Sequence, residues 1–278
     1  MERRSFLKWA GLGALGTAAA PLATAIQKSA PHVQPAAGEL KAKRWAMVID
    51  TRKCLKERGC TKCIEACDQG HNVPYLFPGR RLPLLSNPKH EVKWDWKEPF
   101  DHVFPELSGP FLEPAKKEEP TLVMCNHCDD PPCVRVCPTQ ATFKRADGIV
   151  MQDLHRCIGC RYCMVACPFG SRSFNWEDPR QYFAPWTPGE PEANPDFPTR
   201  TKGVVEKCTF CAERLDVGEM PLCVEACAKV FAPLGTSPAM TFGDRDDPKS
   251  PVAQILRTAN VVRRKPELGT SPNVFYIL

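Results

Sequence analysis

Apolar positions in this chain recur only over short stretches, and polar or turn-forming residues separate one stretch from the next. This pattern predicts small helices and strands joined by long loops. Strands are expected over residues 44–50, 141–145, 149–152, 239–242 and 274–278. Helices are expected over residues 161–166, 212–217 and 252–258, the second ending at Gly218. Asp147-Gly148 lies between two of these strands and is typical of a hairpin turn.

The composition adds a second feature to this picture, an excess of cysteine. Sixteen of the 278 residues are cysteine, and the chain is too long for a disulfide-stabilised miniprotein. The cysteines form four groups along the chain: Cys54/Cys60/Cys63/Cys67, Cys125/Cys128/Cys133/Cys137, Cys157/Cys160/Cys163/Cys167 and Cys208/Cys211/Cys223/Cys227. Because four thiolates ligate one four-iron cluster, these cysteines suffice for four clusters with none left over.

The third group has the most specific spacing. It reads CIGCRYCMVACP from Cys157 to Pro168, which is the C-x2-C-x2-C-x3-C-P run of bacterial ferredoxins. In such a run three cysteines wrap one face of a cubane cluster, and the fourth ligates a second cluster. Gly159 permits the unusual backbone angles that a close approach to cluster sulfur requires. A zinc site prefers two separated C-x2-C pairs, and a disulfide framework has no such spacing rule, so the run favours iron–sulfur over both alternatives.

The first group departs from this spacing, because five residues separate Cys54 from Cys60. Residues 55–59 are expected to bulge that loop; the alternative is that Cys54 is a spare thiol. Two histidines, His127 and His155, lie close to cysteines in the sequence and are conceivable iron ligands. Since the cysteines already saturate the irons, we expect these histidines to hydrogen-bond near the clusters or to lie on the surface.

The N-terminal residues 1–25 read MERRSFLKWAGLGALGTAAAPLATA, with a twin arginine ahead of Ser5-Phe6-Leu7-Lys8 and a weakly apolar run. They resemble a twin-arginine export signal, and residues 23–25 offer a small-residue cleavage site. The alternative is an N-terminal membrane anchor, for which the Gly/Ala run is short and poorly apolar. Residues 26–43 are polar, contain Pro31 and Pro35, and are expected to form a linker.

The formal net charge of +5 at pH 7 is compatible with a nucleic-acid or membrane-surface partner. Removal of residues 1–25 lowers this charge to about +3. Four oxidised clusters of roughly −2 each bring the mature protein to about −5. The composition therefore gives no support for nucleic-acid binding. The sequence also has no glycine-rich phosphate loop, nucleophile elbow or paired-carboxylate motif.

With these motifs placed, nearly everything after residue 43 resembles a known family. The segments that carry the resemblance are CNHCDDPPCVRVCPTQATFKRADGIVMQDLHRCIGCRYCMVACPFGSRSF, FPTRTKGVVEKCTFCAERL and RRKPELGTSPNVFYIL. They resemble the NrfC/PsrB-type four-cluster ferredoxin subunits of membrane redox complexes, and more narrowly the DsrO-type subunit of DsrMKJOP complexes. The resemblance implies an α+β fold of two tandem, pseudo-symmetric bacterial-ferredoxin-like units, each holding two [4Fe-4S] clusters, with long loop insertions.

On this plan residues 44–278 form a single four-cluster ferredoxin domain. An inner unit covers residues 121–176, and an outer unit combines residues 44–67 with 203–245. Insertions at 68–120 and 177–202 and a C-terminal tail at 246–278 complete the domain. The insertions are rich in proline and aromatic residues, which are expected to pack over the clusters or, alternatively, to dock a partner.

The resemblance also implies that the fourth cysteine of each group crosses to a paired cluster. The implied ligand sets are set A (Cys54, Cys60, Cys63, Cys227), set B (Cys208, Cys211, Cys223, Cys67), set C (Cys125, Cys128, Cys133, Cys167) and set D (Cys157, Cys160, Cys163, Cys137). The wide loop of the first group departs from the family spacing, so the geometry of set A depends on how that loop folds.

The function implied by the resemblance is electron relay through four [4Fe-4S] clusters at the periplasmic face of the cytoplasmic membrane. The implied partners are an NrfD-type integral membrane subunit that interacts with quinone, a multihaem cytochrome c subunit and other subunits of a DsrMKJOP-like complex of sulfur metabolism. Complete ligation by cysteine leaves no iron open to substrate, so we expect no catalytic residues and no enzyme activity of the subunit itself.

Three other functions are weighed against this one. An enzyme in its own right requires a three-ligand cluster or a second cofactor site, and the sequence has neither. A zinc-binding interaction module disagrees with the C-P runs and with the export signal. The nearest alternative is the electron-transfer subunit of a molybdopterin polysulfide or tetrathionate reductase, which has the same cysteine pattern.

Overall fold

The structure is a computed structural model, and it describes residues 40–57, 59–74, 90–190 and 192–278. The expected export signal at 1–25 and nearly all of the expected linker at 26–43 lie outside the described residues. Helices and strands are mixed along the described chain, with long connections between them. The described part of the chain contains no helix with the length and apolar character needed to cross a membrane.

A three-stranded sheet lies at the centre of the hydrophobic core. Strand β1 (Trp45–Asp50) is the middle strand; β8 (Met240–Asp244) pairs with it antiparallel and β9 (Val274–Ile277) pairs with it parallel. These elements confirm the strands expected at 44–50, 239–242 and 274–278, with shifts of one or two residues at their ends. Helix α10 (Pro251–Thr258) confirms the helix expected at 252–258.

Both faces of β1 are covered, which explains why it is apolar throughout rather than alternating. Met47 and Ile49 belong to the large core cluster on one face, whereas Ala46 and Val48 pack with Val252 of α10 on the other. Successive side chains of a strand point to opposite faces, so each set needs its own cover. The outcome is a sheet with no exposed apolar face at β1.

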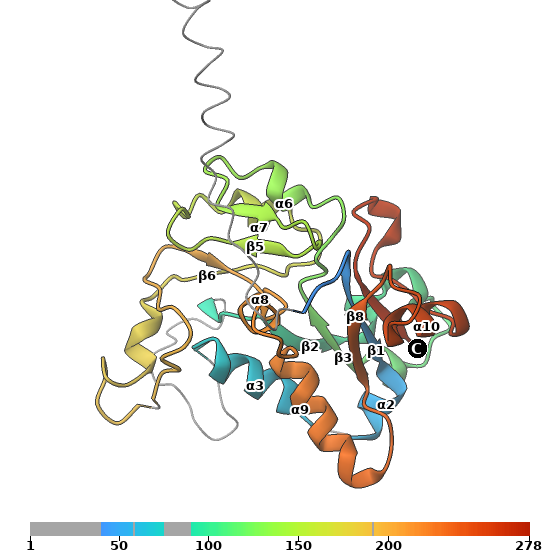
Figure 1. Ribbon diagram of the computed structural model, residues 1–278. Helices are drawn as coiled ribbons and strands as arrows, with labels where there is room; N and C mark the ends of the chain where they lie inside the picture. The colour runs from blue at the N-terminus through green and yellow to red at the C-terminus, as the bar shows by residue number, and fades with distance from the viewer. Residues whose placement is uncertain (1–39, 58, 75–89, 191) are drawn as a thin grey trace, which may run out of the picture. The chain divides into compact units, whose positions relative to one another are not determined.

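Beside this sheet lie two helices that carry cysteines, α3 (Lys62–Gly70) and α9 (Leu222–Phe231), which pack against one another (Figure 1). Their close approach depends on Gly70, because a Cβ atom at this position would lie 2.0 Å from Leu222 Cδ1. Helix α2 (Thr51–Lys56) precedes them and is capped by the Asp50 side chain, which accepts a hydrogen bond from Lys53 N. The expectation of a bulged loop over residues 55–59 is therefore wrong for its first two residues, which continue this capped helix.

The elements within, between and after the second and third cysteine groups are smaller (Figure 1). Strands β4 (Thr142–Lys144) and β5 (Val150–Gln152) confirm the hairpin expected around Asp147-Gly148. Helices α6 (Pro132–Arg135) and α7 (Tyr162–Ala166) pack against each other, and α7 confirms the helix expected at 161–166. The two-residue strands β6 (Ser173–Phe174) and β7 (Val205–Glu206) pair antiparallel.

The first insertion contains regular structure that the sequence pattern does not predict. Strand β2 (Asp95–Pro99) pairs antiparallel with β3 (Pro120–Met124), and α4 (Phe100–Val103), η2 (Pro105–Leu107) and α5 (Pro114–Lys117) lie between them. Trp94, Phe100 and Phe104 are buried in the main core, as expected for aromatic side chains that cover the cysteine groups. Phe111 is different, because 98% of its surface is exposed.

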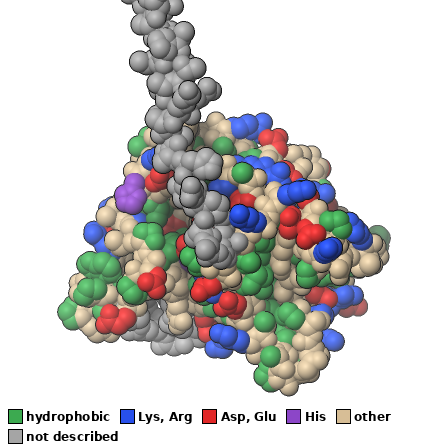
Figure 2. All heavy atoms as spheres, in the orientation of Figure 1, with side chains coloured by type: hydrophobic (Ala, Val, Ile, Leu, Met, Phe, Trp, Pro, Cys, Tyr) green, Lys and Arg blue, Asp and Glu red, His purple; other side chains and the backbone are tan. Residues whose placement is uncertain are grey.

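Short helical turns make up most of the remaining chain. Helix α8 (Ala212–Leu215) ends before the expected limit at 217. The turns η3 (Pro179–Tyr182) and η5 (Pro266–Leu268) begin with proline, and η4 (Ala232–Leu234) has proline as its second residue. On the face that Figure 2 shows, basic and acidic side chains lie next to one another and apolar groups are interspersed. Among the described residues visible on this face, the basic side chains do not form a continuous strip of the kind that binds nucleic acid.

Candidate metal centres

All sixteen cysteines lie among the described residues, and all of them are free thiols. Ten of the thiols are buried, five are half-buried, and Cys160 alone among them is exposed. Burial makes a bare thiolate costly, because the charged form loses its hydration.

Set C encloses a cavity. Cys125, Cys128, Cys133 and Cys167 all line it, together with Pro131, Phe169, Arg172 and other residues of the same loops. Burial raises the pKa of Cys128 to about 12, and the neighbouring charges of Cys125, Cys133 and Cys167 act in the same direction. Four sulfurs around one enclosed space are the arrangement that a cubane cluster requires.

Set D is the most exposed of the four sets. Burial raises the pKa of Cys163, and the charges of Cys133 and Cys157 add to this effect. Backbone N–H groups donate to two of the sulfurs, Thr142 N to Cys137 Sγ and Val205 N to Cys157 Sγ, each at 3.4 Å. Gly159 has a φ of +69°, and a Cβ atom there would lie 2.2 Å from the Gly203 carbonyl oxygen, so only glycine fits this loop.

Set B is buried completely. Burial raises the pKa of Cys67 well above its ordinary value. The charges of Asp95, Cys208, Cys211 and Cys223 are smaller causes that act in the same direction. Phe210 N donates to Cys208 Sγ, and Leu222 N donates to Cys211 Sγ, each at 3.4 Å. Helix α3 thus brings a cysteine of the first group to three cysteines of the fourth.

Set A includes Cys54, the cysteine that from the sequence alone is either a cluster ligand or a spare thiol. Burial raises its pKa, Lys97 lowers it, and the charges of Cys227 and Cys60 raise it further. The pKa of Cys63 is raised mainly by burial and then by the charge of Asp95. The charges of Cys54, Cys227 and Cys60 raise it further. Lys97 Nζ donates to the Cys60 carbonyl oxygen at 2.6 Å and so holds the end of the wide loop. Cys54 therefore lies in electrostatic contact with the other three thiols rather than apart from them.

Charges in one set also shift the pKa values of cysteines in the next set, and these effects link the sets in the order A, B, C, D. The charge of Cys63 in set A raises the pKa of Cys223 in set B, after burial and nearer charges. Burial raises the pKa of Cys208 in set B to about 12, with the charge of Cys125 in set C as the next cause. Cys133 in set C affects Cys163 in set D. The thiols thus form a continuous series from set A to set D.

The donor sets fit [4Fe-4S] clusters on chemical grounds. Groups of four thiols, most of them buried and several with raised pKa values, can become thiolates together only if positive charge is supplied between them. Iron supplies that charge, and backbone N–H groups directed at sulfur stabilise the ligands. Sets C and D belong to loops with C-x2-C-x2-C or C-x2-C-x4-C spacing, which suits a cubane better than a zinc site.

The two histidines are not placed as iron ligands. His127 is buried, stacks on Phe210 at 3.7 Å between ring centroids, and accepts a hydrogen bond from Val150 N at its Nδ1 atom. Burial lowers its pKa well below the ordinary value, as do the charges of Lys207 and Arg172. The side chain of His155 is 89% exposed. One histidine is thus a neutral packed group and the other a surface group, as expected.

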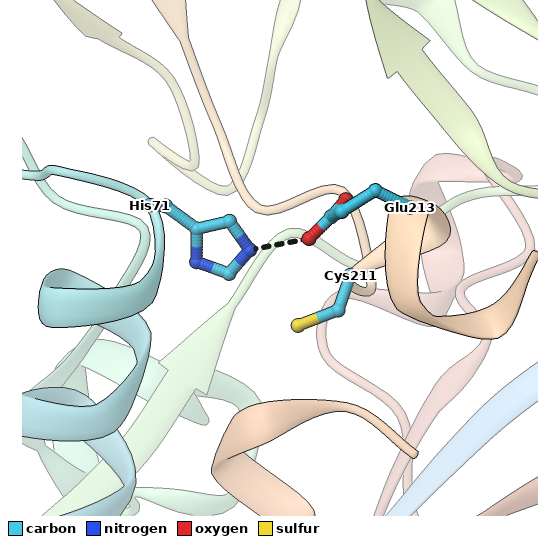
Figure 3. Close-up of side chains that lie close together, drawn as sticks. All are labelled: His71, Cys211 and Glu213. Carbon is cyan, nitrogen blue, oxygen red and sulfur yellow. Dashed lines mark hydrogen bonds and ion pairs between the residues drawn. The ribbon is translucent and has the colours of Figure 1, made fainter. Parts of the chain in front are cut away.

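Figure 3 shows His71, Cys211 and Glu213 close together. His71 Nε2 pairs with Glu213 Oε1 at 2.9 Å, and its Nδ1 atom lies 2.8 Å from the Cys67 carbonyl oxygen. His71 also stacks on Trp94, with 4.4 Å between ring centroids. Because Cys211 belongs to set B, we assign this group to the same centre: the histidine joins the end of α3 to α8 beside the sulfurs.

Three buried charged side chains near the sulfurs are not predicted by the sequence pattern. Asp95 acts on sets A and B, Arg172 on sets C and D, and Lys207 donates through Nζ to the carbonyl oxygens of Val150 and Cys208. Their only sequence signal is position: Asp95 lies between two tryptophans, and Lys207 directly precedes a cysteine. Because charged side chains are mostly exposed, the sequence alone does not lead one to expect that these three are buried.

Comparison with known proteins agrees with this chemistry. The family model described as a 4Fe-4S dicluster domain matches residues 121–181. The chain is 39% identical to the Hdr-like menaquinol oxidoreductase iron-sulfur subunit 1 of Archaeoglobus fulgidus, over 99% of this chain and 97% of that protein. It is 34% identical to the B subunit of tetrathionate reductase from Salmonella typhimurium, over 99% and 88% respectively. It is 31% identical to protein NrfC of Escherichia coli, over 99% and 95%. The chain belongs to the NrfC/PsrB-type family of 4Fe-4S iron–sulfur subunits.

Proposed function

We propose that this protein is an electron-transfer subunit that relays electrons through four [4Fe-4S] clusters and has no substrate site of its own. The observation that supports this most directly is the continuous series of thiols from set A to set D. In the proposal each set ligates one cluster through four cysteines. Complete cysteine ligation leaves no iron position for substrate, so the clusters pass electrons and do no other chemistry.

The exposure of the sets supports a route with two ends. All four cysteines of set B are buried, so in the proposal its cluster exchanges electrons with the neighbouring clusters. Cys54 and Cys60 of set A are half-buried, and Cys160 of set D is exposed. Electrons therefore enter at one of these two ends and leave at the other.

The surface around Cys160 suits a protein partner. Ile158, Tyr162 and Val165 are exposed to 67%, 62% and 88% of their surface, and all three lie within five residues of that cysteine. Exposed apolar groups gathered at one place are typical of an interface. In the proposal an NrfD-type integral membrane subunit that interacts with quinone docks here, and a multihaem cytochrome c subunit serves the other end.

The finer assignment is to a DsrO-type subunit of a DsrMKJOP-like complex of sulfur metabolism, exported by the twin-arginine pathway to the periplasmic face of the membrane. It rests on the residues between the cysteines and on the twin-arginine segment. The similarity to the Archaeoglobus protein, whose name specifies a menaquinol oxidoreductase, supports the quinone partner.

A second candidate is the electron-transfer subunit of a molybdopterin polysulfide or tetrathionate reductase. It is favoured by the similarity to the tetrathionate reductase protein of Salmonella over almost the whole chain. Isolation of the native complex distinguishes the two candidates. A c-type haem spectrum without molybdenum supports the first, and stoichiometric molybdenum supports the second.

The test of the relay itself is iron content with EPR spectroscopy of the anaerobically purified protein. Four clusters predict about sixteen irons per chain and magnetic coupling between neighbouring clusters on full reduction. About twelve irons per chain would contradict the four-cluster proposal and implicate the loop after Cys54. Stoichiometric zinc would contradict the proposal as a whole.

A further inference from the structure

Arg172 is a buried cation in the loop after α7, with 5% of its surface exposed. Its Nη1 atom donates to Gln152 Oε1 at 2.9 Å and to Thr142 Oγ1 at 3.2 Å, both neutral groups of the β4–β5 hairpin. Its Nη2 atom is buried and has no hydrogen-bond partner. Among the ion pairs of the described residues, none joins a carboxylate to this guanidinium.

The free side of the guanidinium faces sulfur. Burial lowers the pKa of Arg172, but the charges of Cys133, Cys163 and Cys125 outweigh burial and raise it. The charge of Arg172 in turn lowers the pKa of Cys163. Arg172 lines the cavity that the four cysteines of set C enclose. The guanidinium thus lies beside the sulfurs of set C and within electrostatic range of Cys163 in set D.

A second buried arginine provides the contrast. Arg200 is 4% exposed, and it forms a bidentate pair with Glu206, at 2.6 Å from Nε to Oε1 and 2.7 Å from Nη2 to Oε2. The positive charge of Arg200 is therefore cancelled by protein. An uncancelled guanidinium is costly to bury, and the anions within its reach are the thiolates of two neighbouring sets.

Adding one electron to a [4Fe-4S] cluster makes it more negative by one charge, with no bond formed or broken and no proton required. A fixed positive charge nearby stabilises the reduced state, and it does so strongly where water is excluded. Since Arg172 lines the cavity of set C and its charge also acts on Cys163 of set D, it acts on both clusters at once.

We propose, on the basis of the relay function above, that Arg172 is a shared potential-setting residue that raises the reduction potentials of the two inner clusters, of sets C and D. An electron delivered by the neighbouring cluster of set B then rests on this inner pair before it leaves the protein. The arginine is a positioning charge rather than a catalytic residue, because it takes no part in electron transfer itself.

The test is an EPR-monitored redox titration of the holoprotein and of Arg172→Met and Gln152→Glu variants. Arg172→Met removes the charge and keeps the apolar stem. Gln152→Glu leaves Arg172 in place but puts a carboxylate 2.9 Å from its Nη1 atom. In both variants we expect two of the four EPR signals to change. At a fixed solution potential, their ratio of reduced to oxidised cluster should fall at least tenfold, which corresponds to a reduction potential lower by about 59 mV. The signals of the other two clusters should not move.

Two further variants are matched controls. Arg172→Lys keeps the charge and should restore most of the wild-type titration. Arg156→Met removes an arginine next to Cys157 whose side chain is 65% exposed, and solvent screening should limit its effect to less than about twofold.

The outcomes separate this proposal from the relay itself. If the wild-type protein does not show four [4Fe-4S] signals, the relay function fails before any variant is compared. If Arg172→Met loses iron, the isosteric Gln152→Glu variant decides whether Arg172 sets the reduction potentials. Four unchanged signals in Gln152→Glu with full iron content would overturn the role of Arg172, as would a shift of the same size in Arg156→Met.

Discussion

The outer region, which holds sets A and B, and the inner region, which holds sets C and D, surround their thiols in different ways. The outer helices α3 and α9 are nine and ten residues long and pack beside a three-stranded sheet with the large core. The inner helices α6 and α7 have four and five residues. The separate inner core cluster contains only Cys133, Val150, Cys163 and Val205 as buried members, two of which are thiols.

This difference indicates how each region is stabilised. The outer region buries enough apolar surface to fold around its cysteines as an ordinary hydrophobic core does. The inner region has short elements and, although Ile149 and Cys125 belong to the large core, its own core cluster is small, so we expect the clusters proposed there to supply much of its stability, as structural metals do in small domains.

The regions also differ in the buried charge next to their sulfurs. In the outer region the buried group is the carboxyl of Asp95, whose charge acts on Cys63 and Cys67; burial raises the pKa of Asp95 to about 7. In the inner region the buried group is the guanidinium of Arg172. The electrostatic environment of the sulfurs therefore differs between the two regions, although their cysteine spacings are similar.

Removal of iron should separate the two regions most clearly. In iron-free protein we expect amide hydrogen exchange in β4, β5, α6 and α7 to accelerate by more than about a hundredfold. The strands β1, β8 and β9 should keep most of their protection, because their core does not depend on metal. Hydrogen-exchange mass spectrometry of holo and iron-free protein measures this. Equal loss of protection in both regions would contradict the comparison.

The buried ion pair between Arg200 and Glu206 joins the two regions. Glu206 lies on β7, and Arg200 Nη1 donates to the His71 carbonyl oxygen at the end of α3, at 2.6 Å. We expect Arg200→Met to cost about 3–5 kcal/mol, because it leaves the Glu206 carboxylate buried without its partner. Native-state hydrogen exchange under anaerobic conditions measures the loss.

Arg200→Met/Glu206→Leu is the matched control for this pair. It removes both charges, so it should recover a substantial part of the loss. A double variant as unstable as the single one would show that packing, rather than the unpaired charge, accounts for the effect.

The sequence predicted the parts of this molecule that depend on local pattern. Alternation and the Asp147-Gly148 turn were enough for the β4–β5 hairpin, and a continuous apolar run was enough for β1. Cysteine spacing was enough to group the thiols, although the crossing of ligands between groups came from family resemblance.

The features that were missed depend on contacts between distant residues. Helices α3 and α9 carry cysteines where an apolar stripe would otherwise be seen, so their pattern is weak. Strand β2 reads Asp-Trp-Lys-Glu-Pro, and only its pairing with β3 makes it a strand. Arg172 and Asp95 resemble surface residues in sequence, because the sulfurs that explain their burial are brought to them by other segments.

Truncation of a single core side chain in each region sharpens the comparison. Ile49→Ala in β1, where Ile49 is fully buried, should cost about 2–5 kcal/mol in both holo and iron-free protein. Val150→Ala in β5 should cost about 2 kcal/mol in the holoprotein. In iron-free protein it should cost nothing, since the inner region is already unfolded there. A persistent cost of Val150→Ala without iron, again measured by hydrogen exchange, would show that the inner core is stable by itself.

The smallest effect is expected at the exposed contact between the regions. Arg145, in the turn after β4, pairs with Asp216, after α8, at 2.7 Å, but the side chain of Asp216 is 45% exposed. Because water screens such a pair, a double-mutant cycle with Arg145→Gln and Asp216→Asn should give a coupling of only about 0.2–1 kcal/mol, weaker in 1 M salt. Arg145 also pairs with Asp147 at 3.0 Å, so the Arg145/Asp147 cycle is the control for charge lost within the inner region alone. A coupling above about 2 kcal/mol between Arg145 and Asp216 would mean that this surface pair, and not the buried Arg200–Glu206 pair alone, joins the two regions.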